Sequence, residues 1–316
     1  MSDDRRGASP GGLNRPRGAA QRLGFAGIGN MGWPMAARLV EAGHAVAVTD
    51  LSAERAARFA AEAGGHVAGS PEEAAAGAGA FLCILPTSRE VALVAEAVLP
   101  VLPEGALFID LTSGNPARTR EIAARLATRG IRLVDCPVSG GVSRARSGEL
   151  AIMAGGADSD LDEAEPILRA MGTSIHRCGP VGAGQAMKAL NNLVSAGGFL
   201  IGIEALLIGQ KFGLEPGVMV DVLNASTGMN NSTQKKFRQF VLSRRFDSGF
   251  GLELMVKDLS IALEVGKEAG VPAPLAALVR ELSAAALAHL GPGQDHTALA
   301  KLSEALAGQV LAGGNG

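Results

Sequence analysis

The sequence LGFAGIGNMG at residues 23–32 decides the fold of this 316-residue chain. Its first four residues are predicted to form a short apolar strand, and the glycine turn after them opens an amphipathic helix that runs to about Ala42. Gly43 ends this helix, and a second apolar strand at residues 45–49 finishes at Asp50. A strand, a glycine turn, a helix and a second strand ending in an acid form the complete context of a dinucleotide-binding unit.

Each glycine of the turn has a different predicted structural role. Gly27 allows the tight turn, Gly29 lets the backbone approach a pyrophosphate, and Gly32 lets the helix pack on the strand. The pyrophosphate would rest on the first amides of the helix, because these N–H groups have no partner within the helix. We therefore predict that a cofactor binds along Gly27, Gly29, Asn30, Met31 and Gly32.

The acid at the end of the second strand bears on the choice of dinucleotide. Asp50 is expected to accept hydrogen bonds from a ribose 2′-hydroxyl and to repel a 2′-phosphate, which favours NAD over NADP. Arg55 and Arg58 weaken this inference, because an arginine can receive a phosphate. Both arginines equally suit a solvated helix face.

The alternation of apolar strands and helices continues beyond Asp50. Helices are predicted over residues 53–63, 71–76, 89–99 and 117–129, and strands over residues 80–85, 107–111, 132–135, 149–154 and 175–178. This spacing predicts a Rossmann-type, doubly wound parallel sheet with helices on both faces. Ligands bind at the carboxyl ends of such strands, so we expect Leu85, Pro86, Thr112 and the segment after Asp135 to line one crevice.

The segment after Asp135 contains Ser139, Gly140 and Gly141. The serine hydroxyl and two successive glycine amides can together hold a carboxylate. The alternative is a tight turn into the next strand, and the local sequence alone favours it. If these groups bind a ligand, that ligand is a small carboxylate.

A long apolar helix is predicted from Ala183 to about Gly213. Its apolar residues occupy every side of the helical wheel, the pattern of a helix enclosed by protein. Lys188 and Asn192 are four residues apart and project from one face, with Gly184 one turn earlier leaving space above them. Lys188 either reaches solvent from the helix start or is a desolvated lysine tuned for proton transfer.

The rest of the chain is predicted to be helical, with segments near residues 218–224, 232–242, 252–268, 274–290 and 298–311. We therefore predict three parts: a disordered tail over residues 1–21, a dinucleotide-binding domain over residues 22–181, and an all-α substrate and dimerisation domain over residues 182–316. The long helix joins the two domains. Small residues and apolar faces in the helical domain suggest a homodimer or a homotetramer.

Several residues leave alternatives open. Asn231 and its neighbours either bind substrate hydroxyls or only cap a helix. Arg144 and Arg146 either reach an acidic substrate or face solvent. Lys257 and Asp258, as an isolated pair, are most often a solvated surface feature.

The composition limits the chemistry and the partners. The chain is 47% hydrophobic and 19% charged with a formal net charge of -2, so nucleic acid and an anionic membrane surface are poor partners and a small molecule is expected. Cys83, Cys136 and Cys178 have no paired spacing, which indicates a reducing, cytoplasmic compartment and no metal site. The absence of tyrosine leaves lysine, histidine or a carboxylate as general acid.

Taken together, these stretches resemble the β-hydroxyacid dehydrogenase family, a 6-phosphogluconate dehydrogenase-like group that includes 3-hydroxyisobutyrate dehydrogenases and tartronate semialdehyde reductases. The resemblance rests on residues 27–36 as the cofactor turn, 135–141 as the substrate segment, 182–192 as the catalytic helix and 257–258 as a lysine pair near the cofactor. It implies that Lys188 is the catalytic acid/base and that Asn192 orients substrate and lysine. It further implies that Ser139 and its two glycines hold the substrate carboxylate and that Lys257 closes over the cofactor.

The resemblance leads to a hypothesis of an NAD(P)-dependent oxidoreductase that transfers a hydride between nicotinamide and a short 3-hydroxy acid or its semialdehyde. An imine reductase on the same fold is an alternative, although imine-reducing relatives generally replace the lysine that stands here as Lys188. A non-catalytic dinucleotide-binding protein is an alternative from another class. The chain departs from the family at Thr112 and Ser113, where a Ser-Thr pair is usual, and at Arg144, where glycine is common.

Overall fold

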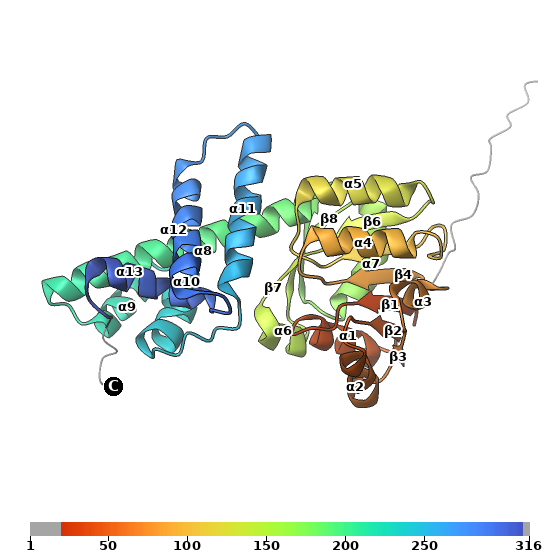
Figure 1. The fold of residues 1–316 in the computed structure, drawn as a ribbon, viewed down its shortest axis with the longest axis horizontal. Coiled ribbons are helices and arrows are strands. Elements are labelled where there is room, and N and C mark those ends of the chain that lie inside the picture. The colour runs from red at the N-terminus through yellow and green to blue at the C-terminus, as the bar shows by residue number, and fades with distance from the viewer. Residues whose placement is uncertain (1–19, 312–316) are drawn as a thin grey trace, which may run out of the picture.

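The structure, a computed structural model, describes residues 20–311 and consists of two parts joined by one long helix (Figure 1). The first part is a sheet with helices on both faces. The second part, within residues 183–311, contains helices and one isolated β-bridge between Gly251 and Asp295. This architecture confirms the predicted Rossmann-type sheet followed by an all-α region. Most of the predicted tail, residues 1–21, lies outside the described residues.

The first part alternates strands and helices as predicted. Its elements are β1 (Arg22–Ala26), α1 (Gly32–Glu41), β2 (Ala45–Thr49), α2 (Ala53–Ala63), β3 (His66–Val67), α3 (Pro71–Ala75), β4 (Ala80–Cys83), α4 (Ser88–Val98), β5 (Leu107–Asp110), α5 (Pro116–Ala127), β6 (Arg132–Asp135), β7 (Val138–Ser139), α6 (Gly141–Ser147), β8 (Ala151–Gly155), α7 (Asp158–Arg169) and β9 (Ser174–Gly179). Several of these helices have a side chain at the N-cap position that accepts a backbone amide of the first turn. The hydroxyls of Ser52 and Ser70, for example, accept the Arg55 and Glu73 amides in the first turns of α2 and α3.

Strands β1 to β6 are parallel and lie in the order β3-β2-β1-β4-β5-β6. The next strand differs from a purely parallel sheet, because β8 pairs antiparallel with β6 and β7, and β9 then pairs parallel with β8. The segment between β6 and β8 contains the short strand β7, which lies antiparallel on β8, and the seven-residue helix α6.

Apolar side chains fill both faces of the sheet. One cluster holds Met35 and Leu39 of α1, Phe59 of α2 and Leu161 of α7 against Phe25 of β1. The other cluster packs α3, α4 and α5 on the opposite face. The sheet is therefore doubly wound, and its loops at the carboxyl ends of the strands are free to form a crevice.

The long helix α8 (Ala183–Phe212) begins and ends as predicted, with Gly213 at its C-terminal cap. The prediction that it is enclosed on every side is wrong. Val194, Ile201 and Ile208 are 76%, 63% and 71% exposed. The helices α11 (Leu252–Glu268), α12 (Pro274–Leu290) and α13 (Ala300–Ala307) pack against α8 and bury Phe199, Ile203 and their neighbours. One chain therefore covers only part of the apolar surface of α8.

The length and composition of α8 would also suit a membrane span. It is the one such helix among residues 20–311, and 50% of its most apolar window is buried inside the structure. Core helices of soluble proteins pass the same test.

The helical part contains α9 (Pro216–Asn224), α10 (Asn231–Lys235), a π-helix η1 (Phe237–Leu242), α11 (Leu252–Glu268), α12 (Pro274–Leu290), a 3₁₀ helix η2 (His296–Leu299) and α13 (Ala300–Ala307). The helix predicted over residues 232–242 is interrupted at Lys236, whose φ of -127° departs from helical geometry. The helix predicted over residues 298–311 ends early, because Gly308 is left-handed with φ of 60°.

Candidate active site

The glycine turn has the geometry that its sequence predicts. Gly27 has φ of +90°, which favours glycine, and a Cβ at Gly32 would lie 1.8 Å from the carbonyl oxygen of Gly27. A Cβ at Gly29 would meet nothing within 4 Å, so this position borders open space. Met31 is the N-cap of α1 and makes no side-chain cap bond. The Trp33 amide donates to the Gly29 carbonyl oxygen at 2.9 Å and Pro34 has no amide hydrogen, so Gly32 is the residue of this first turn whose amide could bind an anion. Asn30, in the same turn, is exposed.

Asp50 organises the turn from the end of β2. Its carboxylate accepts the backbone amides of Ile28 and Ser52, both at 2.9 Å. Arg55 Nη1 also lies 3.1 Å from Asp50 Oδ1, so a cation stands next to the acid. Arg58 is engaged elsewhere, with its guanidinium carbon 4.8 Å from the centre of the Trp33 ring.

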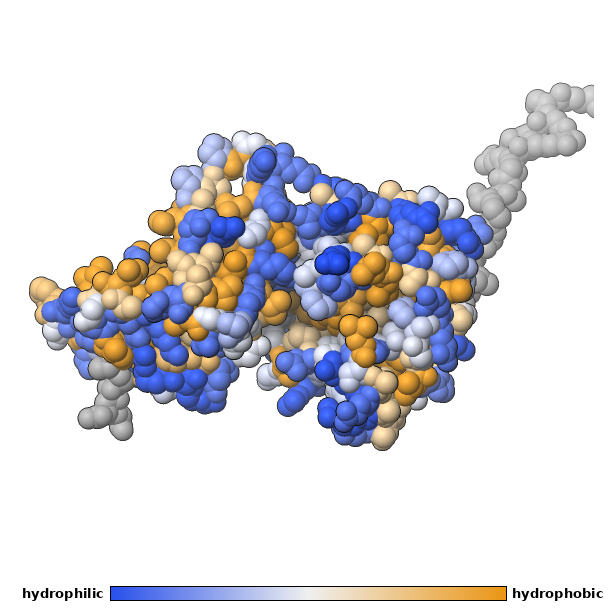
Figure 2. Space-filling model, in the orientation of Figure 1, coloured by the Kyte–Doolittle hydropathy of each residue, from blue (hydrophilic) through white to orange (hydrophobic). Residues whose placement is uncertain are grey.

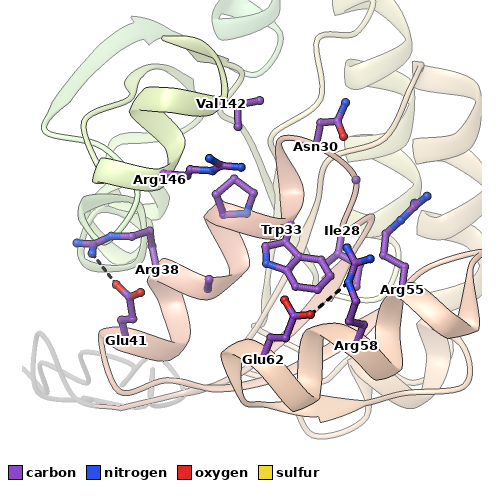
Figure 3. Close-up of a pocket in the computed structure, with 13 residues that line it drawn as sticks. Ile28, Asn30, Trp33, Arg38, Glu41, Arg55, Arg58, Glu62, Val142 and Arg146 are labelled. Atoms are coloured by element: carbon purple, nitrogen blue, oxygen red, sulfur yellow. Dashed lines mark hydrogen bonds and ion pairs between the residues drawn. The ribbon is translucent and has the colours of Figure 1, made fainter. Parts of the chain in front are cut away.

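A cavity of about 560 Å³ adjoins the glycine turn, between α1, α2 and α6 (Figure 3). Gly29, Asn30, Trp33 and Arg55 line it, and Arg146 reaches it from α6. Lys188 and Ser139 are not among its lining residues. The cavity therefore belongs to the cofactor side of the molecule.

The loops after β4 and β5 are tied together at the carboxyl edge of the sheet. Thr112 is buried, its amide donates to Asp110 Oδ1 at 3.0 Å, and its hydroxyl accepts the Leu85 amide at 3.0 Å. The hydroxyl of Thr112, a predicted cofactor contact, is thus already engaged within the protein. Pro86 contributes its carbonyl oxygen, which accepts from Lys257 Nζ at 3.4 Å.

Two buried carboxylates hold the start of α8, and the sequence reasoning missed both. Asp135, at the end of β6, accepts the amides of Gly182 at 2.7 Å and Gln185 at 2.8 Å. Gln185 Nε2 donates to Asp110 Oδ2 at 3.2 Å, and its Oε1 accepts the Gly114 amide at 2.7 Å. Burial raises the pKa of Asp110 to about 7 and raises the pKa of Asp135 as well. The only signal in the sequence was that both acids end apolar strands.

Lys188 follows Gln185 by three residues and is buried, with 8% of its surface exposed. The interpretation that it reaches solvent is therefore wrong. Desolvation lowers the pKa of Lys188, Asp258 opposes this shift, and Lys257 adds to it. At a given pH a larger fraction of this amine is therefore neutral, and able to accept a proton, than of an exposed lysine.

Asp258 connects Asn192 to the strand-end loops. Its carboxylate accepts from Asn192 Nδ2 at 2.5 Å and from Ser113 Oγ at 2.8 Å. Lys257 Nζ lies 3.4 Å from Asp258 and donates to the Ser113 carbonyl. Lys257 and Asp258 are therefore not a solvated surface pair: they connect α11 to the loop after β5, and Asp258 is only 1% exposed. The one sign of this role for Asp258 in the sequence was that it directly follows Lys257.

The predicted substrate segment lies where β7 passes into α6. Ser139 is half-buried at the end of β7, and Gly140 and Gly141 have φ of 136° and 67°. Gly141 begins α6, so its amide is among those without a partner in the helix. This segment follows Asp135 by four residues, and Asp135 is hydrogen-bonded to the start of α8. The end of β6 therefore links the predicted substrate segment to the helix that carries Lys188.

Asn231 is exposed as the first residue of α10. Its neighbour Asn230 caps this helix by accepting the amides of Ser232 at 2.7 Å and Thr233 at 3.1 Å. Capping therefore explains Asn230, whereas the side chain of Asn231 does not cap this helix and is exposed. Arg144 is exposed on α6. Among residues 20–311 no group of three or more His, Cys, Asp or Glu side chains is arranged to hold a metal ion.

Comparisons with known proteins agree with this geometry. The family model for the NAD binding domain of 6-phosphogluconate dehydrogenase matches residues 22–179, and the model described as NAD-binding of NADP-dependent 3-hydroxyisobutyrate dehydrogenase matches residues 182–303. A 2-(hydroxymethyl)glutarate dehydrogenase from Eubacterium barkeri is 34% identical, covering 93% of this chain and 98% of the relative. A 3-hydroxyisobutyrate dehydrogenase from Pseudomonas aeruginosa is 37% identical, covering 82% of this chain and 90% of the relative.

A solved structure of Mycobacterium tuberculosis 3-hydroxyisobutyrate dehydrogenase with L-serine superposes with a TM-score of 0.83 at 34% identity, covering 90% of this chain and 99% of that one. Hydride exchange with a nicotinamide dinucleotide is the chemistry that this crevice supports, so the chain is an oxidoreductase of the dehydrogenase class. It belongs to the β-hydroxyacid dehydrogenase family.

A Streptomyces aurantiacus imine reductase has the same fold, with a TM-score of 0.60 over 89% of this chain and 99% of that one. Its identity to this chain is 20%, so the likeness concerns the fold alone.

Proposed function

We propose that this chain oxidises a short 3-hydroxy acid with NAD, or reduces the corresponding semialdehyde, with Lys188 as the group that transfers the proton. The observation that carries the proposal is the burial of Lys188 close to the start of α8, which Asp135 holds at the carboxyl edge of the sheet. A desolvated amine beside a dinucleotide site is suited to exchange a proton with an alcohol.

In the proposed oxidation, Ser139 Oγ and the amides of Gly140 and Gly141 hold the substrate carboxylate at the start of α6. The nicotinamide, when bound, supplies the acceptor for the hydride of the alcohol carbon. Lys188 Nζ takes the proton of the hydroxyl and returns it in the reverse direction. Asn192 orients the substrate and the lysine, and its own side chain is fixed by Asp258.

The proposed cofactor site begins at the glycine turn, where open space at Gly29 suits a pyrophosphate. Asn30, Met31 and the Gly32 amide at the start of α1 would hold the phosphates. On the other side, the loop at Leu85 and Pro86 and the loop at Thr112 would border the nicotinamide, with Lys257 closing over it. Asp50 supports NAD as the preferred cofactor, and the nearby Arg55 reduces the repulsion that a 2′-phosphate would meet.

We also propose that residues 22–181 bind the cofactor, and that residues 182–316 contribute to the substrate site and join subunits. The exposed apolar side chains of α8, Met187, Val194, Ile201 and Ile208, recur every seven residues and form one stripe. Hydrophobic residues gather over the helical part in Figure 2. A homodimer or homotetramer in the cytoplasm would cover them, and sedimentation of the purified protein as a monomer would contradict this proposal.

The proposal is tested by following NADH absorbance at neutral and alkaline pH. The substrate panel contains 3-hydroxyisobutyrate, 2-(hydroxymethyl)glutarate, glycerate, 3-hydroxypropionate, threonate and serine, with NADP in parallel. We expect turnover of at least one acid, and faster turnover with NAD than with NADP. Tight NADH binding without turnover of any acid would contradict the proposal and favour an imine substrate or a non-catalytic role.

A further inference from the structure

Lys236 occupies an unusual place for a lysine. It lies between α10 and η1, is half-buried, and points its Nζ at Ser195 of α8, 3.1 Å from the hydroxyl oxygen. Among residues 20–311 no carboxylate lies within ion-pair distance of it. Desolvation lowers the pKa of Lys236 to about 8, and attraction to Asp295 opposes this shift. The described part of the chain therefore compensates the charge of this lysine poorly.

Asp295 does not serve as a dedicated partner for Lys236. Its carboxylate already accepts from Ser248 Oγ at 2.9 Å, from the Gly249 amide at 2.8 Å and from the Thr297 amide at 2.9 Å. The neighbouring His296 is buried, and burial together with Lys236 lowers its pKa to about 4, so near neutral pH it is uncharged and does not offset the charge of Lys236. A desolvated cation whose only direct partner within residues 20–311 is a hydroxyl is suited to receive an anion.

The location of Lys236 connects it to the proposed active site. Lys188, Asn192 and Ser195 stand at positions i, i+4 and i+7 of α8, so all three project from the same face. The axial distance between the Lys188 and Ser195 positions is about 10 Å at 1.5 Å per residue. Lys236, hydrogen-bonded to Ser195, therefore lies over the same face of α8 as Lys188, about two helical turns further along the helix.

Resting on the function proposed above, we propose that Lys236 and Ser195 bind a second acidic group of the substrate. The substrate is then a 3-hydroxy acid with a carboxylate at each end. The carboxylate next to the reacting carbon binds at Ser139 and the glycine pair, the hydroxyl faces Lys188, and the distal carboxylate pairs with Lys236. Lys236 determines specificity and takes no part in the proton transfer.

The test compares two acids that differ only at the distal end. In 2-(hydroxymethyl)pentanoate a methyl group replaces the distal carboxylate of 2-(hydroxymethyl)glutarate. We expect the wild-type protein to have a kcat/KM for the diacid roughly tenfold to hundredfold higher, the range of a charge-assisted hydrogen bond. Lys236→Gln should remove this preference by raising KM for the diacid, and leave the monoacid unchanged. Lys235→Gln, one residue earlier and exposed, is the matched control and should behave as wild type.

The inference is overturned if the wild-type protein oxidises both acids equally well, or if Lys236→Gln retains the full preference for the diacid. Oxidation of neither acid, nor of any member of the earlier panel, overturns the proposed function itself and is thereby distinguishable. Binding of NADH reports that the variant is folded. If Lys236→Gln does not fold, competition in the wild-type protein decides: glutarate must inhibit at least tenfold more strongly than pentanoate, and equal inhibition contradicts the inference.

Discussion

Gly29 and Gly32 belong to the same turn, but alanine should reduce thermal stability at Gly32 and weaken dinucleotide binding at Gly29. At Gly32 the added Cβ would lie 1.8 Å from the carbonyl oxygen of Gly27, a backbone atom that cannot rotate away. Overpacking of this kind costs about 1–3 kcal/mol, and this contact is at the severe end. For a domain of this size each kcal/mol corresponds to roughly 2–4 °C, so a cost of about 3 kcal/mol in Gly32→Ala should lower Tm by about 6–12 °C.

At Gly29 the added Cβ would meet nothing within 4 Å, and the backbone is outside the left-handed region. Gly29→Ala should therefore leave Tm within about 1–2 °C of wild type, the effect of a neutral surface substitution. The methyl group would instead stand where the backbone meets the pyrophosphate. We expect the Kd for NADH to rise at least about tenfold, which is 1.4 kcal/mol of binding free energy.

Trp33 makes the assay direct, because it is the only tryptophan, the chain has no tyrosine, and the residue lines the cavity beside Gly29. Quenching of its emission by NADH measures binding, and a thermal melt of the same samples measures stability. The two variants control for each other. The reasoning about the turn is refuted if Gly29→Ala binds NADH like wild type, or if Gly32→Ala melts at the wild-type temperature.

Three further predictions concern charge. Asp50→Ala should lower the ratio of NAD to NADP activity at least about fivefold, because the acid that repels a 2′-phosphate is gone, and an unchanged ratio would contradict its assignment. His296 has a folded pKa of about 4 against about 6.5 unfolded, so the stability it confers is present above pH 6.5 and decreases as pH falls toward 4. Between pH 6.5 and 5 this amounts to about 2 kcal/mol, and melts of His296→Gln should show a smaller loss over that window; parallel curves would disprove the burial argument. Because the pKa of Lys188 is lowered, kcat/KM for oxidation should rise with pH and level off below the pKa of about 10.4 of an exposed lysine, and a flat profile would contradict its role as the base.

Much of the fold could be predicted because it depends on local sequence. The strand at residues 45–49 and the helices at residues 53–63, 252–268 and 274–290 have the predicted bounds. Ser52 caps the first of these helices, Pro274 and Gly291 bound the last, and apolar periodicity marks the others. Reversal of β8 could not be predicted in this way. It depends on the pairing of β8 with β6 and β7, and the apolar pattern of a strand does not specify the direction of its neighbours.

The candidate site shows the same division. The glycine turn and the position of Asp50 at the end of β2 could be predicted because each stands in a recognisable local pattern, whereas the helix sequence left the burial of Lys188 open. The roles of Asp110, Asp135 and Asp258 could not, because their partners lie far along the chain: Asp135 bonds to Gly182, and Asp258 bonds to Ser113. Likewise, an apolar helical wheel cannot distinguish burial within one chain from burial between two, so the exposed stripe of α8 was missed.

The central claim is that Lys188 transfers the proton and does not bind the dinucleotide. It is tested most directly by measuring turnover and NADH binding together in Lys188→Ala, using the fastest acid of the panel and the Trp33 signal. We predict that turnover falls about 10²- to 10⁴-fold while the Kd for NADH stays within about twofold of wild type. Turnover close to the wild-type rate in a variant that binds NADH normally would contradict the account.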